Sequence, residues 1–134
     1  MSDSTARALL SSVTPFFIVR KLARAVAFYR DGLDFEVTFQ SPEPEPFFAI
    51  VRRDGASFML KEIAPEVAPM PNATRHAWAS WDAFIHTQDP DALAAEFAAR
   101  HVVFEAPLAD TADGLRGFSV RDHDGYTLFF GRPC

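Results

Sequence analysis

The sequence predicts an α+β protein built from two β-α-β-β-β modules, and three observations lead to this prediction. Short apolar runs bounded by Gly, Pro, Asn or Asp are typical of strands, and two segments repeat their apolar residues at helical spacing. Asp54-Gly55 and Asp124-Gly125 each separate two strand-like runs, as the turn of a β-hairpin does. The order strand, helix, three strands occurs twice, and such an internal repeat shapes the whole fold.

Length and composition favour a single domain spanning residues 1–134. The chain has 134 residues, of which 49% are hydrophobic, so a real core can form. A net charge of −5 argues against a nucleic-acid partner, which needs a basic surface. The only cysteine is Cys134, so neither an internal disulfide nor a thiolate metal cluster is expected. Without a long apolar run or a signal peptide, we expect a cytoplasmic protein with no membrane partner.

The first module is predicted at residues 12–62. Its helix follows from Leu22, Tyr29 and Leu33, which recur at helical spacing, and Gly32 is a suitable residue for the helix end. A proline- and acid-rich loop at 41–46 then separates two strands. The expected elements are a strand at 13–20, a helix at 21–31, a strand at 35–40 and a hairpin of strands at 47–53 and 56–62.

The second module is predicted at residues 81–133, after a connecting loop at 63–80. A loop of that length in a compact domain is either functional or a linker. Asp89 is the expected N-cap of the second helix and Pro90 its first residue. The expected elements are a strand at 81–87, a helix from 90 to about 100, a strand at 102–105 and a hairpin with strands at 118–120 and 126–130.

Two motifs point to a known family. The first is Phe28-Tyr29-Arg30-Asp31-x-Leu33 at the helix end. The second is the closing series Leu-Arg-Gly-Phe, Arg-Asp-x-Asp-Gly and Leu-Phe-Phe-Gly within residues 115–131. Together they resemble the vicinal-oxygen-chelate superfamily, which includes glyoxalase I, bleomycin-resistance protein and extradiol dioxygenase, and the resemblance covers residues 12–133. It implies that the two modules form an open, U-shaped mixed sheet with the helices on the outer face and a ligand in the concavity.

Superfamily enzymes bind a divalent metal through four strand positions, and the resemblance places three of them at Pro15, Asp82 and Phe129. The fourth falls within 57–61, which holds neither a carboxylate nor an imidazole. Only Asp82 has a suitable donor atom. We therefore expect no metal, no other cofactor and no catalytic residue, so a non-enzymatic role is favoured. The alternative is a metal-dependent lyase, isomerase or dioxygenase with a rearranged ligand set of Asp82, His86 and His76 under a folded 63–80 loop.

The family register predicts what lines the concavity in place of a metal. Side chains alternate along a strand, so Pro15, Phe17 and Val19 are expected to face inward, with Phe16 and Ile18 toward the helix. Arg116 is a candidate partner for Asp82, whose burial would otherwise be costly. The expected ligand-binding residues are Phe17, Trp78, Trp81, Asp82, Phe84, His86, Arg116 and Phe129. A third reading makes these phenylalanines plain core residues of an interaction or storage protein.

The resemblance is strongest to the metal-free, bleomycin-resistance type. It implies a homodimer that sequesters an aromatic small molecule, such as an antibiotic, in an aromatic groove near the dimer interface. Asp82 and the acidic residues Glu43 and Glu45 would favour a cationic ligand. The chain departs from that type at Ala112-Asp113-Gly114, where Pro-Trp-Gly is usual, and at Arg116-Gly117-Phe118, where Arg-Glu-Phe is usual. These departures argue against bleomycin itself as the ligand.

Overall fold

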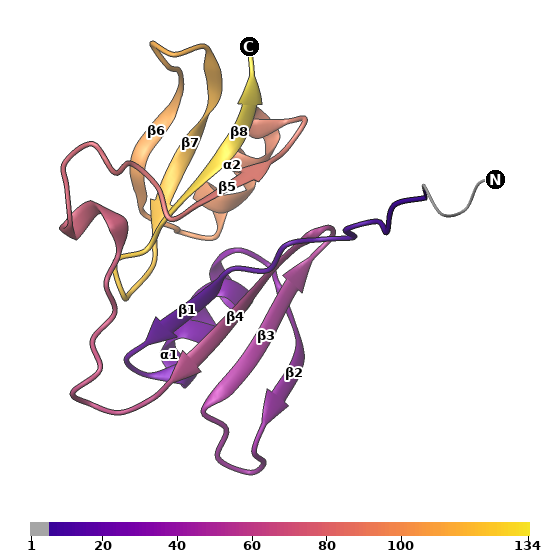
Figure 1. Cartoon of the computed structure of the whole chain (residues 1–134). Coiled ribbons are helices and arrows are strands. Elements are labelled where there is room, and N and C mark those ends of the chain that lie inside the picture. Colours follow the sequence, from indigo (N-terminus) through magenta and orange to yellow (C-terminus); the bar gives the residue numbers. More distant parts are fainter. Residues whose placement is uncertain (1–5) are drawn as a thin grey trace.

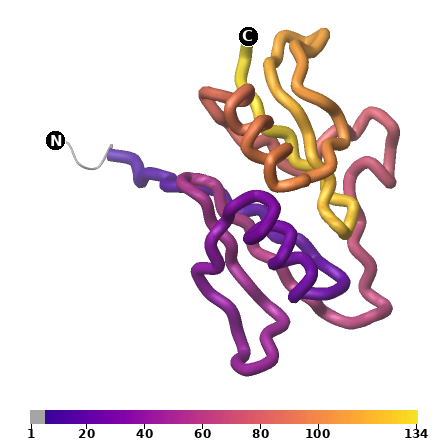
Figure 2. Tube along the Cα trace, turned by 180° about the vertical axis from the view of Figure 1, so that it is seen from behind, coloured from indigo at the N-terminus to yellow at the C-terminus, as the bar shows by residue number. Residues whose placement is uncertain are grey.

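A computed structural model describes residues 6–134 and confirms the α+β class with two β-α-β-β-β modules (Figure 1). Each module forms its own four-stranded sheet. The helices of both modules lie on the same side, behind the sheets in Figure 1 and in front of them in Figure 2. We call the helix-bearing side of each sheet its back face and the other side its front face. No helix of the described residues is long and apolar enough to span a membrane.

The first sheet has the strand order β1-β4-β3-β2, with β1 parallel to β4. The helix expected at 21–31 is an α-helix that widens into a π-helical turn over its second half. The strand expected at 13–20 pairs over only four residues. The elements are β1 (Phe16–Val19), α1 (Leu22–Ala27), η2 (Phe28–Gly32), β2 (Glu36–Ser41), β3 (Phe48–Arg53) and β4 (Ala56–Glu62).

The second sheet repeats this arrangement as β5-β8-β7-β6, with β5 parallel to β8. Asp89 caps α2 as expected, because its Oδ1 accepts a hydrogen bond from the Ala92 N–H at 3.0 Å. The strand expected at 102–105 begins later and is longer. The elements are η3 (Asn72–Thr74), β5 (Ala83–His86), α2 (Pro90–Ala99), β6 (Phe104–Asp110), β7 (Leu115–Arg121) and β8 (Thr127–Pro133).

The side chains of β1 point to the faces opposite to those expected, as if the alternation were shifted by one residue. Phe17 and Val19 are 7% and 1% exposed and belong to the core behind the first sheet. Phe16 is 53% exposed and lies on the front face. The reason is the parallel register with β4, which pairs Phe17 with the buried Leu60. A shift of one residue moves every side chain of a strand to the other face.

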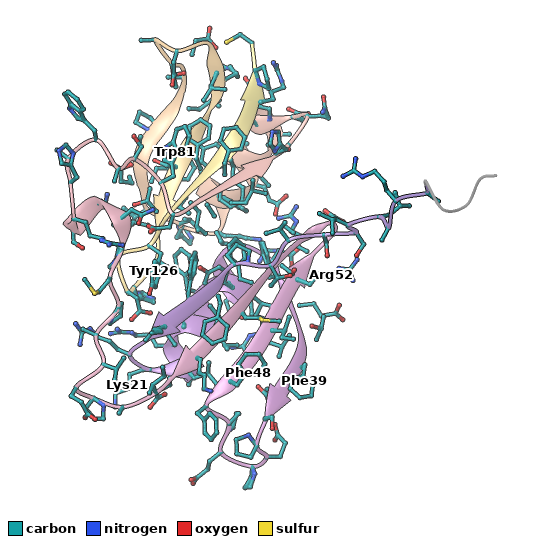
Figure 3. All side chains as sticks on the ribbon, viewed as in Figure 1. Lys21, Phe39, Phe48, Arg52, Trp81 and Tyr126 are labelled. Atoms are coloured by element: carbon teal, nitrogen blue, oxygen red, sulfur yellow. The ribbon has the colours of Figure 1, made fainter. Side chains whose placement is uncertain are left out.

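The turn between β7 and β8 joins the two modules. The Tyr29 hydroxyl of the first module donates to Asp122 Oδ2 at 3.1 Å, and the Tyr126 hydroxyl donates to the Ile18 carbonyl at 2.7 Å. The Tyr126 ring also stacks on Phe17, with ring centroids 4.1 Å apart. Figure 3 shows Tyr126 between the two sheets. The helix-end motif and the Asp-x-Asp-Gly motif are therefore two halves of one contact.

Candidate ligand-binding site

Three aromatic side chains form a cluster on the front face of the second sheet. Parallel pairing sets Phe84 of β5 beside Phe129 of β8, and their ring centroids are 5.1 Å apart. Trp81 stacks on Phe129 at 4.6 Å (Figure 3). His86 follows on the same face, with its ring centroid 4.6 Å from that of Phe84. Phe84, His86 and Phe129, three of the residues expected to line the concavity, thus lie on one face of this sheet.

Two glycines form the floor of this aromatic cluster. Gly117 and Gly131 lie opposite each other on β7 and β8. A Cβ atom on Gly131 would lie 2.6 Å from the Phe129 ring, so only the absence of a side chain lets that ring lie flat on the sheet. Phe129 is consequently 4% exposed, whereas Trp81 and Phe84 are only half-buried. Trp81, Phe84 and the exposed His86 therefore present the accessible surface.

A row of polar side chains borders the aromatic cluster. Ser119 lies directly opposite Phe129 in the β7–β8 register and is buried. Its hydroxyl donates to Glu105 Oε1 at 2.6 Å. Arg121, two residues further along β7, donates from Nε to Thr127 Oγ1 at 3.0 Å. Ser119, Glu105 and Arg121 were not predicted from the sequence, although the alternation of Ser119 with Phe118 and Val120 could have placed Ser119 on the front face.

Asp82 has a structural role that the sequence did not reveal. Its Oδ1 accepts from the Asn72 N–H at 2.8 Å, and its Oδ2 accepts from the Thr127 N–H at 2.9 Å. The carboxylate therefore ties the long connection to the start of β8. The expected partnership with Arg116 is wrong, because Arg116 forms ion pairs with Asp91 at 2.8 Å and Asp110 at 3.3 Å.

The two tryptophans have different environments. Trp81 belongs to the aromatic cluster, whereas Trp78 is 88% exposed on the connecting loop. The Trp78 ring meets the edge of the His76 ring at 5.8 Å, and its backbone N–H donates to His76 Nδ1 at 3.0 Å. Trp78 thus offers a free aromatic face, but it is not part of the packed cluster.

The metal positions implied by the family do not fit a divalent cation. Pro15 and Phe129 lack donor atoms, and both oxygens of Asp82 already accept backbone hydrogen bonds. His76 is engaged with Trp78. Within residues 6–134, no three His, Cys, Asp or Glu side chains gather closely enough to hold a metal ion. The rearranged ligand set of Asp82, His86 and His76 is not assembled in this structure.

A cleft of about 620 Å³ lies beside the aromatic cluster, between the two modules. One wall is β5 and its flanks, including Phe84 and His86. The opposite wall is the β3–β4 turn together with Pro15. Arg53 stands at this wall and forms an ion pair with Glu96 of α2 at 2.7 Å. The accessible edge of the aromatic cluster therefore continues into a cleft of small-molecule size.

The first sheet presents an exposed aromatic row on its own front face. Phe48 lies between Phe16 and Phe39, with ring centroids 6.3 Å and 6.1 Å away. Phe16 and Phe39 are each about half exposed. Figure 3 shows Phe39 and Phe48 side by side, with Arg52 further along β3. Among residues 6–134, no other segment covers the exposed rings of this face.

Solved structures similar to this one include a bleomycin-binding protein and an antibiotic binding protein. TioX from Micromonospora sp. ML1 is 20% identical with a TM-score of 0.69, covering 92% of this chain and 99% of that one. The bleomycin-binding protein of Streptomyces verticillus, solved with copper(II)-bleomycin, is 24% identical with a TM-score of 0.67, covering 92% and 97%. TnmS3, an antibiotic binding protein from Streptomyces sp. CB03234, is 20% identical with a TM-score of 0.66, covering 95% and 100%.

At these identities the structural similarity establishes the fold. A search among curated proteins finds no significant match. A family model does match, over residues 10–130, which is nearly the whole chain. On that match, the chain belongs to the Glyoxalase/Bleomycin resistance protein/Dioxygenase superfamily.

Proposed function

We propose that this protein binds an aromatic small molecule, such as an antibiotic, on the front face of its second sheet without reacting with it. The observation that carries the proposal is the half-buried pair Trp81 and Phe84 around the flat Phe129 ring. Each additional aromatic pair contributes about 0.5–1.5 kcal/mol beyond area burial. The neighbouring cleft provides room for a ligand larger than a single ring.

The residues at the family's metal positions favour binding over catalysis, because they offer no suitable set of donor atoms. Pro15 and Phe129 cannot hold a metal, and Asp82 is engaged with backbone N–H groups. The names of the antibiotic-binding and bleomycin-binding neighbours support a binding role for this chain. Trp78 adds an exposed aromatic face on the connecting loop, which could close over a bound ligand.

We further propose that the site is completed in a homodimer. The aromatic row Phe16, Phe39 and Phe48 is an exposed apolar patch, and such patches can mark protein–protein interfaces. Arg52 and Lys61 stand on the same face of the first sheet, whereas the front face of the second carries Glu105. In a twofold dimer, the first module of each copy would cover the second module of the other, burying the aromatic row twice.

Fluorescence tests the proposed site. The Trp78→Phe variant leaves Trp81 as the only tryptophan, so its emission reports on the aromatic cluster alone. Titrating planar aromatic antibiotics should quench this emission in a saturable way, and Trp81→Phe with Trp78 retained is the matched control for the loop. A panel that neither quenches Trp81 nor raises the melting temperature would overturn the proposal.

A further inference from the structure

We propose that Glu105, held in place by Ser119, makes the site prefer an aromatic ligand that carries a cationic amine. This inference rests on the proposed function, because it assumes that the ligand stacks on the cluster of Trp81, Phe84 and Phe129. It assigns the charge preference to a residue on β6, in place of Asp82 and the 43–45 loop that the sequence suggested.

The strand register brings Glu105 to the level of the aromatic cluster. Ser119 is directly opposite Phe129, and its hydroxyl reaches across to Glu105 Oε1 at 2.6 Å. Phe104 of β6 pairs with Val120 of β7, and Ala106 pairs with the adjacent Ser119. Glu105 is therefore an extra residue on β6, which forms a β-bulge. Bulges change the direction of side chains and are frequent next to binding sites.

The distance from the aromatic cluster to Glu105 suits a planar ligand of about three fused rings. Phe129 lies on β8 and Glu105 on β6, two strands away. Neighbouring strands are about 4.8 Å apart, so roughly 10 Å separates the two along the sheet. A tricyclic ligand stacked beside Trp81 could therefore bring an amine at its far end to the carboxylate.

The second oxygen of Glu105 is available to such an amine. Ser119 occupies Oε1, while Oε2 forms only a long ion pair with Arg121 Nη2 at 3.9 Å, which exceeds hydrogen-bond distance. Arg121 is itself anchored on Thr127. The Glu105 side chain is 38% exposed, so a ligand can approach it. In contrast, Asp82 has no free oxygen, since both accept backbone N–H groups.

Two tricyclic dyes of the same size separate stacking from charge. Calorimetry at a pH of about 8 would compare proflavine, a cation, with acridine, which is neutral there. The wild-type protein should bind proflavine about fivefold more tightly than acridine, the scale of a partly exposed ion pair. Glu105→Gln keeps an acceptor for Ser119 and should abolish this preference, so that proflavine binds no more tightly than acridine. Glu36→Gln, an exposed site on β2, is the control for net charge.

The possible results separate the role of Glu105 from the proposed binding of an aromatic ligand. If both dyes bind and Glu105→Gln leaves their ratio unchanged, the assignment of Glu105 is overturned while the proposed aromatic site stands. If Glu36→Gln lowers the ratio as much as Glu105→Gln does, the preference comes from net charge and the inference also fails. If neither dye binds the wild-type protein, the proposed function fails and the inference fails with it.

Discussion

The front faces of the two modules occupy equivalent places in the repeat but differ in shape. The pairing of Phe16 with Met59 corresponds to that of Phe84 with Phe129. By the same correspondence, Phe48 and Lys61 in the first module stand where the second has Gly117 and Gly131. The first face therefore carries large side chains at these positions, whereas the glycines let the Phe129 ring lie flat on the second.

A polar difference accompanies the difference in shape. Ile50 of the first module corresponds to Ser119 of the second. Ile50 pairs with Met59, and Ser119 pairs with Phe129, the residue equivalent to Met59. The first face is therefore apolar at its centre, and the second carries a hydroxyl that holds a carboxylate. Repetition of a fold thus supplies two scaffolds, and a few side chains decide that only one carries the candidate binding site.

The largest expected effect comes from filling the glycine floor. Gly131→Val would place a Cβ atom 2.6 Å from both the Phe129 ring and the Arg116 carbonyl oxygen. We expect a loss of unfolding free energy of about 3 kcal/mol or more, since neither neighbour can move cheaply. Urea denaturation measures this effect. Gly55→Ala is the control, since a Cβ there meets nothing within 4 Å. Equal stability of the two variants would contradict the glycine argument.

The stability of the protein should depend on pH through Asp122, which lies at the contact between the two modules. Burial raises the pKa of this carboxyl to about 6, even though the Tyr126 and Asp124 N–H groups and the Tyr29 hydroxyl donate to it. Because the folded protein then holds the proton more tightly than the unfolded chain, stability should fall as pH rises from about 4 to 6, by on the order of 2 kcal/mol. Asp122→Asn should flatten this slope in urea denaturation measured across that range, and an unchanged slope would exclude Asp122 as its cause.

The exposed aromatic row should govern self-association. Phe39→Ser removes one half-exposed ring from the first face without touching the core. We expect dimer dissociation to become about tenfold easier, on the scale of an interface residue that contributes more than about 1 kcal/mol. Sedimentation velocity over a range of concentrations measures this change. Val103→Ser, at another exposed apolar residue away from the row, is the control, and equal effects of both changes would argue against this face as the interface.

The smallest effect is expected at Trp78. Its ring is 88% exposed, so Trp78→Phe should change stability by less than about 0.5 kcal/mol. Trp81→Phe should cost more, about 1 kcal/mol, because Trp81 stacks on Phe129. Thermal unfolding of the two variants, followed side by side, checks this order. A larger loss at Trp78 would mean that the loop is held by contacts of that ring.

The elements of the fold were predictable because their signals are local. Asp89 and Pro90 mark the start of α2, and the Asp-Gly pairs mark two hairpin turns, each through the preference of one or two residues. The repeat then yields the two-module order. Element ends were less accurate, as at β1 and β6, because pairing partners decide where a strand stops.

The candidate site was predicted only in part. Phe84 and Phe129 were placed on one face correctly, since alternation within two parallel strands sufficed. Phe17 was misplaced because alternation does not tell which face meets the helix, and only the pairing of β1 with β4 does. Asp82 and Arg116 were paired wrongly because each finds closer partners brought in from distant parts of the chain.

The sequence by itself determined the class, the repeat and the aromatic content of this protein, because propensity, turn chemistry and periodicity act over a few residues. Only the tertiary structure decided that Tyr29 meets Asp122, that two glycines lie under Phe129 and that Ser119 holds Glu105. Each of these contacts joins different strands or modules through a register that no local pattern encodes. The candidate binding face is therefore a property of the pairing between strands.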